Sequence, residues 1–289
     1  MADIERRRIT VPGATLAIGL AGPGGRLEGS PAICVTHPAE SFVDAARWLA
    51  DAAGAPVVCI APRGIGGSSP APGGALTIDG AVDDVEAVRR ALGVERWLYW
   101  GMSGGSMVGQ RYAIRHPDAL TGLLLFSAGP CWRRTLTDPA CVVSPSHPAW
   151  RGPLAAAAIV DGSADPAPPD GATWRRLGAG WAWCRADGRA LLVSPVELSA
   201  AMRSLLPALW AFDTRADLAS VRLPALVLGG TADPIAPIAH VRELHERLAG
   251  STFAAIDGAG HAPLSDRASA VTAAVRRFVA GNRSRGVSS

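Results

Sequence analysis

This chain of 289 residues contains no lysine, and all 28 of its basic residues are arginine. It therefore lacks the amine that forms Schiff bases with carbonyl substrates. It also lacks the lysine with which a P-loop reaches the phosphates of a nucleotide. Both kinds of chemistry are excluded for this chain.

Cysteine is scarce and scattered, which argues against a disulfide framework or a zinc site. The five cysteines are odd in number and far apart: Cys34, Cys59, Cys131, Cys141 and Cys184. His147, His240 and His245 have no partner at metal-ligand spacing either. We therefore expect no metal site and no cofactor.

Long apolar runs and dense basic segments are also missing. No stretch of 18 apolar residues occurs, and no apolar stretch of signal-peptide length follows the basic residues 6–8. The net charge of +3 is modest, and no arginine-rich run alternates with aromatic residues. We expect a cytoplasmic protein that binds neither membrane nor nucleic acid. Its oligomeric state stays open.

The apolar segments that are present alternate between strand and helix patterns. Residues 9–20 predict a hairpin that turns at Pro12-Gly13, and the polar residues 281–289 predict a frayed end. Strand-like runs recur at 32–36, 56–61, 96–100, 122–127, 224–229 and 252–256, with helical patterns at 42–53, 78–92, 105–115, 238–248 and 265–280. This alternation predicts an α/β fold with a mostly parallel central sheet and helices on both faces.

One short motif carries most of the functional information. The strand-like run 96–100 leads into Gly101-Met102-Ser103-Gly104-Gly105, and a helical pattern follows at once. A serine on such a tight strand-to-helix turn presents its hydroxyl at the carboxyl edge of the sheet, as in a nucleophile elbow. Flanking glycines let the strand and helix approach closely. Ser103 is therefore the candidate nucleophile.

A serine nucleophile needs a histidine base that is itself oriented by a carboxylate. Asp233 follows the strand-like run 224–229, and His261 follows the run 252–256. The carboxyl ends of parallel strands share one edge of the sheet, where ligands bind. The order serine, acid, histidine is also the one expected after such an elbow. We predict a catalytic triad of Ser103, His261 and Asp233.

These motifs resemble those of α/β-hydrolases with a helical cap, which include esterases, thioesterases, carbon–carbon bond hydrolases and proline iminopeptidase-like enzymes. Two more stretches are similar to the family pattern: Val35-Thr36-His37-Pro38 and Arg63-Gly64-Ile65-Gly66-Gly67-Ser68. The resemblance covers nearly all of the chain outside residues 131–215. It implies the α/β-hydrolase fold.

The resemblance also implies an oxyanion hole formed by the backbone amides of Ala39 and Gly104. The chain departs from the family at Pro38, where a glycine is usual. Proline has no N–H, but neither implied donor is a proline, so the hole is retained. His37 and Met102 lie close to these donors in the sequence and are candidate substrate-contacting residues.

The strand–helix rhythm breaks over residues 131–215. By resemblance this stretch is a helical cap inserted into a core of residues 1–130 and 216–289. It holds six of the nine tryptophans: Trp132, Trp150, Trp174, Trp181, Trp183 and Trp210. Because substrate pockets are mostly apolar, we expect Trp132, Trp181 and Trp210 to line one. The substrate is then a small molecule with a bulky apolar or aromatic group.

We therefore predict a serine hydrolase that cleaves an ester or related acyl bond through an acyl-enzyme. A carbon–carbon bond hydrolase or a non-hydrolytic biosynthetic enzyme with the same triad stays open. So does a ligand receptor with an idle triad. An iminopeptidase is disfavoured, because residues 37–41 read His-Pro-Ala-Glu-Ser where those enzymes usually have His-Gly-Gly-Pro-Gly.

Overall fold

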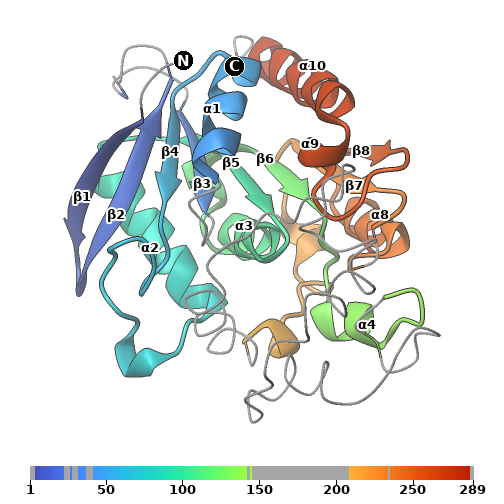
Figure 1. Ribbon diagram of the computed structural model, residues 1–289, viewed down its shortest axis with the longest axis horizontal. Coiled ribbons are helices and arrows are strands. Elements are labelled where there is room, and N and C mark those ends of the chain that lie inside the picture. Colours follow the sequence, from blue (N-terminus) through green and yellow to red (C-terminus); the bar gives the residue numbers. More distant parts are fainter. Residues whose placement is uncertain are drawn as a thin grey trace, which may run out of the picture.

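A twisted sheet of eight strands forms the centre of the computed structural model, which describes residues 4–22, 27, 32–36, 42–141, 144, 208–233 and 235–286 (Figure 1). The spatial order is β1-β2-β4-β3-β5-β6-β7-β8. The strands are β1 (Glu5–Val11), β2 (Ala14–Ala21), β3 (Ala32–Thr36), β4 (Val57–Ile60), β5 (Trp97–Met102), β6 (Leu120–Phe126), β7 (Ala225–Gly230) and β8 (Ser251–Ile256). Strand β2 runs antiparallel to β1 and β4, whereas all pairs from β4 to β8 are parallel.

Helices cover both faces of this sheet (Figure 1). One face carries α1 (Phe42–Ala53) and α10 (Ala268–Gly286), and the other carries α2 (Ile78–Ala91), α3 (Gly104–Arg115) and α8 (Ile238–Arg247). Two shorter helices are α4 (Trp132–Thr137) and α9 (Pro263–Asp266), and 3₁₀ turns span Pro72–Gly74, Pro117–Ala119 and Leu218–Ser220.

The two cores follow from the alternation of side chains along each strand. In β5, Trp97 and Tyr99 belong to the core beneath α2 and α3, whereas Leu98 and Trp100 belong to the core beneath α1 and α10. Successive residues of a strand point to opposite faces, so a strand buried on both sides is mainly apolar along its whole length. This explains why the parallel strands read as continuous apolar runs in the sequence.

The predicted fold class, the hairpin and each predicted strand are confirmed. The prediction for the carboxyl end of the chain is wrong in two respects. The helix expected at 265–280 is divided at Arg267, whose φ of −141° and ψ of 51° are not helical. Residues 281–286, expected to be frayed, continue α10, because Asn282 donates to Thr121 O (3.1 Å) and Arg283 donates to Ala53 O (2.8 Å).

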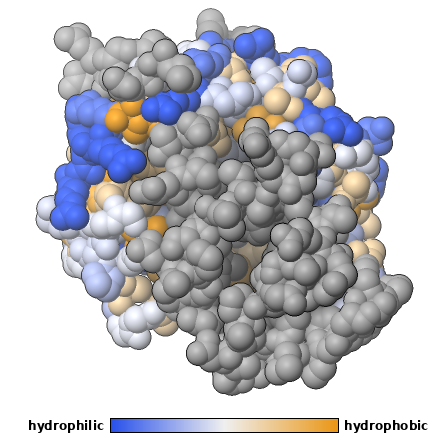
Figure 2. Space-filling model, in the orientation of Figure 1, coloured by the Kyte–Doolittle hydropathy of each residue, from blue (hydrophilic) through white to orange (hydrophobic). Residues whose placement is uncertain are grey.

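On the face shown in Figure 2, the hydrophobic residues of the described surface form only small, separate areas. Strand β1 lies at the edge of the sheet and exposes Arg6, Arg7 and Arg8. Charged side chains on an edge strand oppose pairing with the sheet of another molecule. No helix in the described ranges is long and apolar enough to cross a membrane.

Glu86 links α2 to α3 through a set of charged hydrogen bonds. Its carboxylate accepts from Arg89 (2.7 Å), from Arg90 (2.6 Å) and from the Tyr112 hydroxyl (2.9 Å). Burial raises the pKa of this carboxyl, but the three donors outweigh burial and lower it from 4.5 to about 2. Because the pKa of Glu86 is lower in the folded state, its carboxylate stabilises the fold at pH values above the unfolded-state pKa. This contribution is lost as the pH falls toward 2.

Replacing Glu86 with glutamine should therefore lower the free energy of unfolding at neutral pH by roughly 2 kcal/mol, the scale of hydrogen bonds to a charged group. The difference from the wild type should shrink between pH 4.5 and about 2, because the wild-type carboxyl becomes neutral there. Urea unfolding of both proteins at pH 7 and pH 3 measures it. An equal difference at both pH values would contradict the assignment.

Candidate active site

Ser103 occupies a strained turn between β5 and α3. Its φ of 53° and ψ of −119° lie in a region that residues other than glycine rarely adopt. Such a conformation costs on the order of 1–3 kcal/mol and persists only where the surroundings hold it. Here the Ser103 amide donates to Phe126 O (2.9 Å), and its carbonyl accepts from the Met107 amide (3.2 Å). The tight turn predicted from the sequence is present.

Two glycines of the motif allow this turn to form. A Cβ on Gly101 would lie 2.2 Å from Gly105 O, and a Cβ on Gly105 would lie 2.8 Å from Thr36 O. Both obstacles are backbone atoms, which cannot move aside as a flexible side chain can. The contact distance between strand and helix therefore requires glycine at both positions.

Replacing Gly101 with alanine should lower the free energy of unfolding by about 3 kcal/mol, because the new methyl group overpacks the junction. Gly281 is the matched control, since a Cβ there would meet no atom within 4 Å and the residue lies within α10. Gly281→Ala should be neutral or stabilise by up to about 1 kcal/mol, because alanine favours a helix. Urea midpoints measure both. An unchanged midpoint for Gly101→Ala would contradict the prediction, because it would mean that the junction between β5 and α3 accommodates a methyl group.

Asp233 and His261 form a buried pair. Asp233 follows β7 and His261 follows β8, and the two residues are 5% and 4% exposed. His261 Nδ1 lies 2.9 Å from Asp233 Oδ2 and 3.1 Å from Oδ1. Oδ1 also accepts from the amides of Ile235 (2.8 Å) and Ala236 (2.9 Å). These backbone donors hold the carboxylate so that it faces the imidazole.

The two loops that carry this pair are tied to each other. The amide of Ala232 donates to Ala259 O (2.9 Å), and a Cβ on Gly230 would lie 2.1 Å from the same oxygen. Asp266 in α9 accepts from the Gly260 amide (2.7 Å), next to His261. This role of Asp266 was not predicted from the sequence, in which nothing but its place six residues after Gly260 indicates the contact.

Parallel strands bring Ser103 to the same edge as the pair. Strands β5, β6, β7 and β8 are successive neighbours, so Ser103, Asp233 and His261 all follow the carboxyl ends of strands at one edge. Within the described residues, no hydrogen bond joins Ser103 Oγ to His261. Catalytic hydrogen bonds are often long before substrate binds. The structure thus joins two members of the predicted triad directly, and the triad as a unit stays a prediction.

Some of the other predicted site residues lie in the described part of the chain, and the rest lie outside it. Gly104 is the first residue of α3, beside Ser103. Met102 and Trp132 are each 8% exposed within the cores, and Trp210 is partly buried against the core beneath α2 and α3. His37, Ala39 and Trp181 lie outside the described residues.

The ends of the predicted cap lie next to each other. Cys131 and Asp213 form an isolated antiparallel bridge, and the Thr214 amide donates to Pro130 O (2.9 Å). The buried Gln110 of α3 accepts from the Thr214 hydroxyl (2.8 Å). The chain therefore leaves the sheet layer and returns to it at one place beside α3. The cap and its boundaries stay a prediction, because residues 145–207 lie outside the described part.

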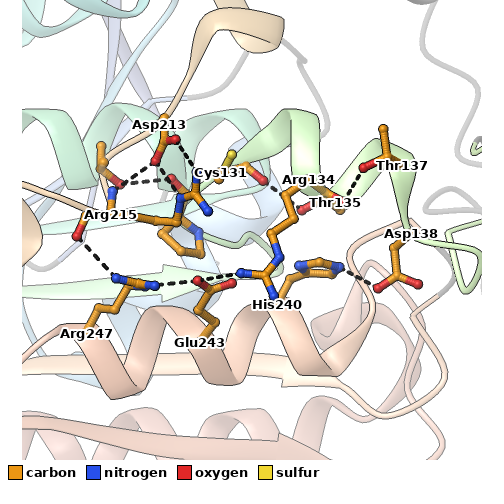
Figure 3. A network of polar contacts seen from close by, with 12 residues as sticks. Cys131, Arg134, Thr135, Thr137, Asp138, Asp213, Arg215, His240, Glu243 and Arg247 are labelled. Carbon is orange, nitrogen blue, oxygen red and sulfur yellow. Dashed lines mark hydrogen bonds and ion pairs between the residues drawn. The ribbon is translucent and has the colours of Figure 1, made fainter.

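A second aspartate–histidine pair lies between α4 and α8 (Figure 3). Asp138 Oδ2 lies 2.7 Å from His240 Nε2, beside a groove of about 620 Å³. A hydrogen bond from the Ala140 amide and the contact with His240 lower the pKa of Asp138. On the same groove, Glu243 accepts from Arg134 (3.1 Å) and Arg247 (2.9 Å). This pair was not predicted from the sequence, because its members are 102 residues apart.

This second pair differs from the first in burial and place. The Asp138 side chain is 29% exposed, whereas that of Asp233 is fully buried. His240 belongs to a helix and not to a loop at the carboxyl edge of the sheet. Two polar pairs on the groove, Arg134–Glu243 and Asp138–His240, join α4 and the residue that follows it to α8. Among the described residues, no three histidine, cysteine or acidic side chains gather as a metal site.

Comparison with known proteins agrees with this architecture. A family model described as alpha/beta hydrolase fold matches residues 37–165, and one described as TAP-like protein matches residues 200–285. The solved structure of an alpha/beta fold family hydrolase from Bacillus anthracis str. Sterne has a TM-score of 0.76 and 18% identity, covering 95% of this chain and 99% of that one.

Curated relatives match at higher identity. A putative carbamate hydrolase, RutD, from Caulobacter sp. (strain K31) is 30% identical over 78% of this chain and 81% of its own length. A pimeloyl-(acyl-carrier protein) methyl ester esterase from Aromatoleum aromaticum is 33% identical over 56% of this chain. The match covers 66% of the length of that esterase. A probable proline iminopeptidase from Streptomyces coelicolor is 38% identical over 35% of this chain, which spans only 33% of that protein. The chain belongs to the α/β-hydrolase family of enzymes.

Proposed function

We propose that this enzyme is a serine hydrolase that cleaves an ester or related acyl bond with Ser103, His261 and Asp233. The observation that carries the proposal is the buried Asp233–His261 pair at the sheet edge where Ser103 holds its strained turn. A buried carboxylate that orients an imidazole toward a serine hydroxyl is the arrangement that activates the hydroxyl for attack.

In the proposed reaction, His261 takes the proton of Ser103 as the hydroxyl attacks a carbonyl carbon. Asp233 holds the imidazole in one orientation and stabilises the cation that forms. The amides of Gly104 and Ala39 hold the developing oxyanion, and losing one such donor costs about 3–4 kcal/mol in a comparable protease site. His261 then protonates the leaving group, and a water molecule that it activates releases the acyl group from Ser103.

The proposed substrate is a small molecule with a bulky apolar or aromatic group. The tryptophans of residues 131–215 support this class, since pockets of this kind are lined mainly by apolar and aromatic side chains. Two of the relatives are named for an ester and a carbamate, and both of these groups contain a carbonyl that bears an oxygen or nitrogen substituent. This supports acyl transfer.

Hydrolysis of p-nitrophenyl esters from acetate to octanoate, with a benzoate, tests the proposal. Turnover by the wild type, together with labelling of Ser103 by a fluorophosphonate, is expected, and the chain-length profile reports the size of the pocket. Labelling without ester turnover would favour a carbon–carbon bond hydrolase or a biosynthetic enzyme. A folded wild type that neither turns over nor labels would favour a receptor with an idle triad.

A further inference from the structure

The hydroxyl of Tyr99 lies beneath the Ser103 turn. Tyr99 belongs to β5, four residues before Ser103, and is fully buried. Its hydroxyl lies 2.7 Å from Gly105 O and 2.5 Å from Thr36 Oγ1. A carbonyl only accepts, so the phenolic proton goes to Gly105 and the Thr36 hydroxyl donates to the Tyr99 oxygen. The direction of both hydrogen bonds is therefore determined.

Three segments meet at this hydroxyl. Thr36 is the last residue of β3, Tyr99 belongs to β5, and Gly105 lies in the first turn of α3 directly after Gly104. The absence of a side chain at Gly105 lets the helix lie against Thr36, as the 2.8 Å distance from a Cβ on Gly105 to Thr36 O shows. The hydroxyl thus joins the start of α3 to two strands at the edge where Ser103 lies.

The ring of Tyr99 also has a defined place on α3. A Cβ on Gly109 would lie 2.4 Å from Tyr99 Cε1 and 2.7 Å from Cδ1. Gly105 and Gly109 are one turn apart on one face of the helix, and together they make room for the ring and its hydroxyl. Burial raises the pKa of Tyr99 well above its usual value, so the hydroxyl keeps its proton at working pH.

We propose that Tyr99 is a positioning residue for acyl transfer, which holds the first turn of α3, and with it the Gly104 amide, in register with Ser103. The inference rests on the proposed function. Groups that act in a transition state must be held to within about 0.5 Å of their productive positions. A shift of the Gly104 amide weakens an interaction made only in the transition state, so it lowers kcat and leaves KM nearly unchanged.

Tyr99→Phe tests this directly, because it removes the hydroxyl and keeps the ring. Complete loss of an oxyanion donor costs about 10²–10³-fold in kcat, so a displaced donor should cost roughly 10–100-fold, with KM within about twofold. The rate of fluorophosphonate labelling at Ser103 should fall in parallel, because it depends on the same donor.

Tyr112→Phe is the matched control. Tyr112 is also fully buried, and its ring centroid lies 6.0 Å from that of Tyr99. Its hydroxyl donates instead to Glu86 Oε2 (2.9 Å), which belongs to α2. Tyr112→Phe should lose stability as Tyr99→Phe does, yet keep the wild-type kcat.

A folded Tyr99→Phe protein with kcat within about twofold of the wild type would overturn the inference, as would an equal loss in Tyr112→Phe. Should Tyr99→Phe not fold, Thr36→Val removes the other hydroxyl and keeps the side-chain shape. It should lower kcat in the same direction, and an unchanged kcat would overturn the inference. A wild type without turnover or Ser103 labelling refutes the proposed function itself, and this inference falls with it.

Discussion

Replacing Ser103 with alanine should abolish ester hydrolysis and leave the fold intact. Removal of the nucleophile of a comparable triad lowers kcat on the order of 10⁶-fold, since no other group can form the acyl-enzyme. The turn itself depends on Gly101 and Gly105 and on the hydrogen bond from the Ser103 amide to Phe126 O, none of which needs the hydroxyl. Turnover of p-nitrophenyl esters and the urea midpoint measure the two parts of this expectation.

Ser106→Ala is the matched control for this experiment. Ser106 is the third residue of α3 and is fully buried. Its hydroxyl has no hydrogen-bond partner among the described residues. Its removal therefore takes away a serine hydroxyl near the site without touching the proposed machinery. Activity retained in a folded Ser103→Ala protein would refute the assignment of the nucleophile.

The features predicted correctly from the sequence are those that neighbouring residues determine. Apolar runs of strand length and helical spacing predict the sheet, because parallel strands buried on both faces are mainly apolar. The Ser103 turn follows from Gly101 and Gly105 for the same local reason, since only glycine permits the backbone contact found there. Chain order then places Asp233 and His261 at the same sheet edge.

The features that were missed depend on residues far apart in the chain. The pairing of Asp138 with His240 spans 102 residues, and the bond between Thr36 and Tyr99 spans 63. No periodicity in either segment signals such a contact. The last turns of α10 were predicted to fray because their residues are polar, but Asn282 and Arg283 bind backbone carbonyls of distant segments. Tertiary contacts override local polarity there.

Asp233→Asn should lower kcat about 10⁴-fold without unfolding the protein. Backbone hydrogen bonds determine which way the new side-chain amide is oriented. The amides of Ile235 and Ala236 donate to Oδ1, so the carbonyl oxygen of the new asparagine must occupy that position. Its NH₂ group then replaces Oδ2, the nearer of the two oxygens to His261 Nδ1 (2.9 Å, against 3.1 Å for Oδ1). This NH₂ group can donate a hydrogen bond to Nδ1 only when the imidazole carries its proton on Nε2.

That tautomer is the wrong one for catalysis, because Nε2 must be unprotonated to take the proton of Ser103. In a comparable triad the same exchange keeps the geometry and costs about 10⁴-fold in kcat. Asp138→Asn is the matched control, since it alters the other aspartate–histidine pair in the same way at 2.7 Å from His240. Turnover at neutral pH and thermal melts of both variants measure the outcome. Loss of activity in Asp138→Asn alone would move the catalytic pair to the groove between α4 and α8, whereas loss in Asp233→Asn alone fixes His261 as the base.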